Sequence, residues 1–161
     1  MTEKIYLDAC IFTAFAHQKH PNHILIKNCI SSLLDFDIEV FSSEWALIEM
    51  NKTLIRDYHY SKDKAKKVAE DFKKNKKFPK INVIFIDIDS TKSCNFKQFF
   101  DYIKNNMIEV KEVHLADAIH SVIMSNNGIR NILTTDTDFK VLEEVISINP
   151  NVFTVMKPKR D

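Results

Sequence analysis

The chain has 161 residues, of which 45% are hydrophobic and 28% are charged, and it contains a single glycine. This length predicts one domain that buries about 70% of the surface of the unfolded chain. Glycine-rich phosphate loops, such as the dinucleotide fingerprint, the Walker A loop and the kinase loop, need several glycines and are excluded. The nucleophile elbow is excluded for the same reason. Any chemistry on phosphates must therefore depend on side chains or metal ions.

The net charge is only +1, but the charge is unevenly distributed. Between residues 62 and 80, nine lysines and three acids give the segment a charge of +6, which leaves −5 for the rest of the chain. A basic segment beside an acidic body suits a protein that holds a polyanion next to carboxylates. The alternative interpretation is a solvated, lysine-rich helix.

The cysteines and the N-terminal residues indicate the compartment. Cys10, Cys29 and Cys94 are far apart, which argues against a zinc ribbon or a disulfide framework. The first residues lack the apolar stretch of a signal peptide, and no run approaches the ~18 apolar residues of a membrane span. We expect a cytoplasmic protein with reduced thiols and no membrane association.

Strands alternate with helices along the chain. The first half is predicted to contain a strand at 5–7, helices at 10–17 and 23–36, a strand at 38–41, a helix from Ser42 or Ser43 to Tyr58, and a lysine-rich helix capped by Ser61 and ended by Pro79. The second half is predicted to contain a strand at 81–88, helices at 94–106 and 114–127, and strands at 129–134 and 152–155.

The strands are continuous apolar runs, which is typical of a parallel sheet covered on both faces. The predicted fold class is therefore α/β, with a central, mainly parallel sheet of about five strands between layers of helices. One domain is expected over residues 1–156, followed by a short basic tail at 157–161. Gly128 directly follows a predicted helix, where the chain needs a residue in the left-handed region.

Three acids follow predicted strands. Asp8 ends the first strand, and Asp136 and Asp138 follow the fourth. Ligands of parallel sheets bind beyond the carboxyl ends of the strands, so these side chains are expected at one edge of the sheet. The alternative role for each acid is that of a helix N-cap.

Two further acids lie on predicted helices. Asp117 is surrounded by apolar residues, where burying an unpaired carboxylate costs several kcal/mol, so a cation is expected beside it. Glu49 is predicted on the side of its helix opposite the apolar stripe, where an ion pair with Lys52 is the alternative. A cluster of carboxylates persists only if a divalent cation neutralises it, and oxygen ligands suit Mg²⁺ or Mn²⁺.

In these segments the sequence resembles the PIN-domain ribonucleases, including the VapC-type toxins of bacterial toxin-antitoxin pairs. The matching segments are 5–8 (IYLD), 42–49 (SSEWALIE), 115–120 (LADAIH) and 132–139 (ILTTDTDF). The resemblance implies a PIN-like α/β/α sandwich and a metal-dependent endoribonuclease. It also implies RNA as the substrate, a homodimer, and, for a toxin, a small antitoxin protein as partner.

The resemblance also implies roles for individual residues. Asp8, Glu49, Asp117 and Asp136 correspond to the acidic quartet that holds Mg²⁺ or Mn²⁺, with Asp138 as a less certain fifth acid. Thr134 resembles the family's hydroxyl near the last acid, and Cys10 lies where the family has the residue that supports Asp8. Apart from the resemblance, His120 lies one turn after Asp117 and is a candidate to support it, with packing beside the apolar stripe as the alternative. Cys10 departs from the family, which usually has Ser or Thr there, and a thiol is a poorer hydrogen-bond partner.

The basic residues are expected to follow the RNA backbone, a contact that carries no sequence information. The predicted set is Lys62, Lys66, Lys67, Lys73, Lys74, Lys76, Lys77 and Arg56. Trp45, Tyr58 and Tyr60 are candidate stacking surfaces, with the core as the alternative place for Trp45.

Two other functions compete with this interpretation. Asp87 and Asp89 follow an apolar strand as in haloacid-dehalogenase-type phosphatases, but that motif usually opens its domain and a later acid pair is absent. A phosphoreceiver-type signalling module would use Asp8, with Lys157 as its lysine, but expects an adjacent pair of acids after the first strand. It leaves Glu49 and Asp117 unexplained.

Histidines and a cysteine near the first helix offer weaker signals. His17, His20 and His23 recur every three residues, but Pro21 breaks a helix that would align them for zinc, so a solvated loop is the preferred interpretation. Cys10 with His17 lacks a third, orienting group and is not favoured as a nucleophile with its base.

Overall fold

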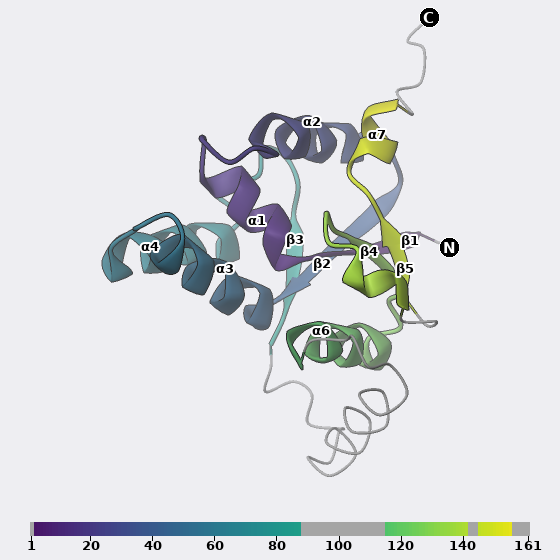
Figure 1. Ribbon diagram of the computed structural model, residues 1–161. Coiled ribbons are helices and arrows are strands. Elements are labelled where there is room, and N and C mark those ends of the chain that lie inside the picture. The colour runs from purple at the N-terminus through teal and green to yellow at the C-terminus, as the bar shows by residue number, and fades with distance from the viewer. Residues whose placement is uncertain (1, 88–114, 142–144, 156–161) are drawn as a thin grey trace, which may run out of the picture.

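The computed structural model describes residues 2–87, 115–141 and 145–155. Its strands form one parallel sheet in the order β3-β2-β1-β4-β5 (Figure 1). The elements are β1 (Glu3–Leu7), α1 (Ala9–Ala16), α2 (His23–Leu33), β2 (Ile38–Ser43), α3 (Glu44–Arg56), α4 (Lys62–Lys73), β3 (Val83–Ile86), α6 (Leu115–Asn126), β4 (Asn131–Leu133), the 3-10 helix η2 (Asp138–Val141), β5 (Ile146–Ile148) and α7 (Asn151–Val155). The predicted α/β fold with a five-stranded parallel sheet is confirmed.

The central strand β1 shows why both faces of the sheet are covered. Successive strand side chains point to opposite faces. Ile5 and Leu7 join the core cluster formed with α1 to α4, whereas Tyr6 joins the cluster formed with α6. Figure 1 accordingly shows α2 and α7 on one side of the sheet and α6 on the other. In the described part of the chain, no helix is long and apolar enough to cross a membrane.

Phenylalanines fix α1 and α4 against the sheet. The ring of Phe12 lies edge-on to that of Phe72 of α4, with centroids 5.0 Å apart, and 5.5 Å from that of Phe78. Phe12 and Phe72 are fully buried. Because such rings bury large apolar areas, this cluster anchors the helix that begins immediately after Asp8.

The order of the strands places a crevice beside β1. The chain runs outward from β1 to β2 and β3 on one side, and β4 and β5 lie on the other. The strand order therefore reverses between β1 and β4, and ligands of open parallel sheets bind in the crevice at the carboxyl ends of such a pair.

The last predicted strand, at 152–155, is wrong. The fifth strand is Ile146–Ile148, and residues 151–155 form α7. Asn149 turns the chain into α7, because its side chain accepts from the amide of Asn151 and its carbonyl accepts from that of Val152. Pro150 suits the first turn of a helix. The predicted helix at 94–106 and the tail at 157–161 lie outside the described residues.

The lysine-rich helix ends at Lys73, before the predicted stop at Pro79. Asn75 has a φ of +53°, and the amide of Lys76 donates to the carbonyl of Asp71 while that of Asn75 donates to Phe72. This is a Schellman motif, which ends a helix by satisfying its last carbonyls.

Gly128 ends α6 in the same way. Its φ is +63°, its amide donates to the carbonyl of Ser125, and the amide of Ile129 donates to that of Met124. A Cβ at this position would have no atom within 4 Å, so a substitution would be strained only by its backbone conformation.

Gly128→Val is therefore expected to destabilise the protein by about 1–2 kcal/mol without creating a clash. Gly128→Asn, which tolerates the left-handed region better, should lose less. Urea unfolding of both variants measures the difference. Equal stability of the valine and asparagine variants would contradict a cost that comes from φ alone.

Candidate active site

Asp8 lies at the crevice between β1 and β4. Its backbone amide donates to the carbonyl of Leu133 at 3.2 Å and so extends the β1–β4 pairing. Its side chain caps α1, with Oδ1 accepting from the amide of Ala9 at 2.6 Å. The Thr134 hydroxyl donates to Oδ2 at 2.7 Å. Asp8 is only 6% exposed, so its carboxylate is held in one orientation.

Cys10 takes the position where the resembled family usually has a hydroxyl. Its thiol donates to Asp8 Oδ2 at 3.2 Å, and its sulfur accepts from the amide of Thr135 at 3.4 Å. Burial, with the charge of Asp8, raises the pKa of the Cys10 thiol to about 12. The thiol therefore stays protonated and keeps its contact with Asp8, which the sequence had left in doubt.

Glu49 projects from α3 toward His120 of α6. Glu49 Oε2 lies 2.5 Å from His120 Nε2, and since a carboxylate only accepts, Nε2 carries the proton. The other ring nitrogen, Nδ1, lies 2.8 Å from the Tyr6 hydroxyl, which lies 2.5 Å from Ser43 Oγ. His120 is 1% exposed. This chain of hydrogen bonds, rather than an ion pair with Lys52, fixes Glu49.

Asp117 of α6 forms a second acidic group with Asp136 and Asp138. Carboxylate oxygens of these three residues lie within 4.8 Å of one another. Asp117 is 8% exposed, and burial, followed by the charges of Asp136 and Asp8, raises its pKa to about 6. Asp136 is exposed, and its Oδ1 accepts from the amide of Asp138 at 2.9 Å. The site therefore contains a carboxyl group whose charge is unfavourable without a cation.

The two groups meet in one pocket of about 230 Å³ at the carboxyl edge of the sheet. It is lined by Asp8, Glu49, Asp117 and Asp136, together with Ala9, Cys10, Thr13, His20 and Thr53. The structure thus brings all four predicted acids together. Asp138 does not line this pocket but lies in the group of Asp117. We call this cavity the acidic pocket.

The residues of the acidic pocket fit a divalent cation. In the described ranges, no lysine or arginine forms an ion pair with Asp8, Glu49, Asp117 or Asp136. His120, which lies 3.6 Å from Asp8, already uses Nε2 for Glu49. The available donors are carboxylate oxygens, which Mg²⁺ and Mn²⁺ prefer.

Comparison with known proteins identifies the fold. No family model and no curated protein matches the sequence. VapC20 of Mycobacterium tuberculosis, a toxin that cleaves the sarcin-ricin loop, matches with a TM-score of 0.63 over 86% of this chain and 95% of its own, at 20% identity. A chain of VapBC2 from Rickettsia felis, solved with a DNA fragment from their promoter, matches with a TM-score of 0.60 over 91% and 98%, at 15% identity. The chain has the VapC-type PIN-domain fold.

The predicted RNA-binding residues are exposed but not all unpaired. Lys73 pairs with Glu44, Lys77 lies 3.7 Å from Asp71, and Arg56 donates to the neighbouring Asp57. Lys62, Lys66, Lys67 and Lys73 lie on α4, whereas Lys74, Lys76 and Lys77 follow it and Arg56 ends α3. Helix α4 packs against α3 and lies at one end of the molecule (Figure 1). All eight predicted residues are exposed, namely Lys62, Lys66, Lys67, Lys73, Lys74, Lys76, Lys77 and Arg56.

The residues of the competing interpretations lie elsewhere. Asp87 follows β3, the edge strand, and does not line the acidic pocket; Asp89 and Lys157 lie outside the described residues. Within the described chain, His17, His20 and His23 form no metal-ligand group, and each bonds a different partner. These partners are Tyr60 for His17, the Asn22 amide for His20 and the Ala14 carbonyl for His23.

Two residues at the acidic pocket and its supporting hydrogen bonds were not predicted from the sequence. His20 lines the acidic pocket, although the sequence indicated only a solvated loop. Tyr6, in the central strand β1, is buried on the α6 side of the sheet, and its hydroxyl connects His120 to Ser43. A tyrosine in an otherwise aliphatic strand was the available signal, because a buried hydroxyl needs a partner.

Proposed function

We propose that this protein is a metal-dependent endoribonuclease that hydrolyses RNA phosphodiester bonds at the acidic pocket. The convergence of Asp8, Glu49, Asp117 and Asp136 at the β1–β4 crevice carries this proposal. The fold shared with VapC20, a toxin that cleaves the sarcin-ricin loop, supports RNA as the substrate. With no glycine-rich loop in the chain, carboxylate-bound metal replaces the usual phosphate cradle.

The four acids would hold one or two Mg²⁺ or Mn²⁺ ions. A bound ion of this kind supplies an activated water and stabilises negative charge on the phosphate. The chain itself orients the ligands. Thr134 and Cys10 direct their hydrogen bonds to Asp8 Oδ2, and His120 holds Glu49. These contacts keep the carboxylates in place where their mutual repulsion would otherwise separate them.

The same proposal gives roles to the basic helix and to partners. The exposed lysines of α4 attract the RNA backbone electrostatically. A role as the toxin of a toxin-antitoxin pair, with a small antitoxin as partner, is supported by the fold shared with a VapBC2 chain. A homodimer and a cytoplasmic location belong to the same proposal.

A nuclease assay tests the activity. The purified protein is expected to cleave RNA when Mn²⁺ or Mg²⁺ is present and to stop when EDTA is added, with activity restored by excess metal. Cleavage that persists in EDTA would contradict the metal site. Absence of cleavage, together with turnover of a phosphomonoester that Asp87→Asn abolishes, would favour the phosphatase. Labelling of Asp8 by acetyl phosphate would favour the receiver.

A further inference from the structure

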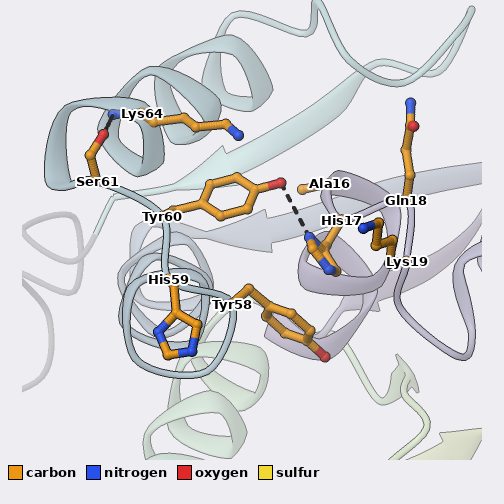
Figure 2. A pocket seen from close by; sticks show the side chains of 9 residues that line it. All are labelled: Ala16, His17, Gln18, Lys19, Tyr58, His59, Tyr60, Ser61 and Lys64. Atoms are coloured by element: carbon orange, nitrogen blue, oxygen red, sulfur yellow. Dashed lines mark hydrogen bonds between the residues drawn. The ribbon is translucent and has the colours of Figure 1, made fainter.

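A second pocket, about 550 Å³ in volume, lies between the end of α1 and the loop that joins α3 to α4 (Figure 2). We call it the aromatic pocket. Nine residues line it, among them His17, Lys19, Tyr58, Tyr60 and Lys64. None of them is acidic, in contrast to the acidic pocket. The cavity therefore differs from the metal site in both chemistry and size.

Three rings form an ordered wall of the aromatic pocket. His17 lies between Tyr58 and Tyr60 (Figure 2), with ring centroids 4.1 Å and 5.8 Å away. The Tyr60 hydroxyl lies 3.3 Å from His17 Nδ1. Tyr58 and Tyr60 are only partly buried, so ring surface remains available to a ligand. Planar π faces of this kind are what nucleic-acid bases stack on.

The charge at the aromatic pocket is positive. Lys64 Nζ lies 4.0 Å from the centroid of the Tyr60 ring, and Lys19 is exposed at the opposite wall. Burial lowers the pKa of His17, and the charges of Lys19 and Lys64 lower it further. The imidazole is therefore a neutral ring near neutral pH, while the two lysines supply the cations.

The aromatic pocket adjoins the acidic pocket. His20 lines the acidic pocket, and its ring centroid lies 5.9 Å from that of Tyr58, which lines the aromatic pocket. A single strand with one phosphate at the carboxylates would thus have a neighbouring nucleotide beside these rings. Proteins that bind single strands combine stacking rings with cations in this way.

We propose that the aromatic pocket binds a nucleotide of single-stranded RNA next to the cleaved phosphate, with the base stacked on Tyr58 and its phosphate beside Lys19 and Lys64. This inference rests on the proposed nuclease function. It adds a site that binds a base, whereas the other exposed lysines of α4 contact only the RNA backbone.

Binding of a fluorescein-labelled, single-stranded oligoribonucleotide to the intact protein tests the proposal. EDTA prevents metal-dependent cleavage, so anisotropy reports binding alone. Tyr58→Leu removes the π face but keeps apolar bulk, and should weaken binding about tenfold, whereas Tyr58→Phe should bind like the parent. Lys64→Gln should also weaken binding and reduce the magnitude of the log–log salt slope by about 0.7.

Lys4→Gln is the matched control. It removes the same charge at the amino end of β1, and Lys4 lines neither the aromatic pocket nor the acidic pocket. If Tyr58→Leu does not fold, Lys64→Gln is compared with Lys66→Gln, which removes a charge from the same helix outside the aromatic pocket. Equal losses of binding in these two variants would overturn the proposal. The proposal would be overturned if Tyr58→Leu and Lys64→Gln bind the RNA as tightly as Lys4→Gln does. The aromatic pocket would then be a candidate site for a protein partner. Pocket-dependent binding by a protein that never cleaves RNA would instead contradict only the nuclease function.

Discussion

Asp8→Asn is expected to lower the rate of metal-dependent RNA cleavage by about 10²–10³-fold or more, a loss typical of removing one group that stabilises transition-state charge. The substitution conserves volume and replaces one carboxylate oxygen by an amide nitrogen. The remaining oxygen can still accept from the amide of Ala9, so α1 keeps its cap. The negative charge and one metal-ligand oxygen are lost, because the amide nitrogen has no free lone pair.

Steady-state cleavage of a labelled RNA at saturating Mn²⁺ measures this effect. Asp35→Asn is the control, since Asp35 is an exposed acid that follows α2 and does not line the acidic pocket. A thermal melt shows whether both variants remain folded. If Asp8→Asn cleaves RNA as fast as Asp35→Asn, Asp8 is not a ligand of the proposed metal site.

Asp117→Asn is expected to stabilise the metal-free protein at pH 7.5 while abolishing its stabilisation by Mn²⁺. The pKa of Asp117 is raised to about 6, so between about pH 4 and 6 the folded chain binds more protons than the unfolded chain. Stability therefore falls as the pH rises through this range. Its ionisation costs up to about 3 kcal/mol without metal, and the neutral amide avoids that cost.

Thermal melts in EDTA and in Mn²⁺, at pH 5 and pH 7.5, separate these effects. The parent should gain stability from Mn²⁺ at pH 7.5 and much less at pH 5, where Asp117 is protonated. Asp37→Asn, which changes an exposed acid, should behave like the parent. If Asp117→Asn melts no higher than the parent in EDTA at pH 7.5, the charge of Asp117 is not the destabilising element.

Asp8 and Asp136 were predicted to be neighbours because parallel topology brings the carboxyl ends of β1 and β4 together. Asp8 and Asp136 needed only the position of each strand in the chain. The left-handed conformation of Gly128 was also predictable, because a glycine directly after a predicted helix indicates a helix end of this kind. Glu49 was placed on a polar helix face, but its orientation depends on His120, which is 71 residues away. Local periodicity carries no information about such a partner.

The incorrect predictions also arise from contacts between residues that are distant in the sequence. Residues 152–155 are β-branched or aromatic enough for a strand, yet Asn149 and Pro150 start a helix whose Phe153 packs on Phe36. Tertiary burial thus overrode intrinsic propensity. The aromatic pocket could be predicted only in part from the sequence. Tyr58 and Tyr60 were recognised as stacking candidates, but their pairing with His17 depends on how α1 packs against α3.

The pairing of β1 with β4 determines when the acidic pocket can be complete during synthesis. Asp8 and Glu49 belong to the first third of the chain, whereas Asp117 and the β4 segment that leads to Asp136 are made last. At about 5–20 residues per second, several seconds separate the two groups of acids. A nascent chain that ends before α6 therefore holds only two of the four proposed metal ligands. If the proposed function holds, RNA cleavage would require β4 to pair with β1, and a chain truncated before β4 would lack it.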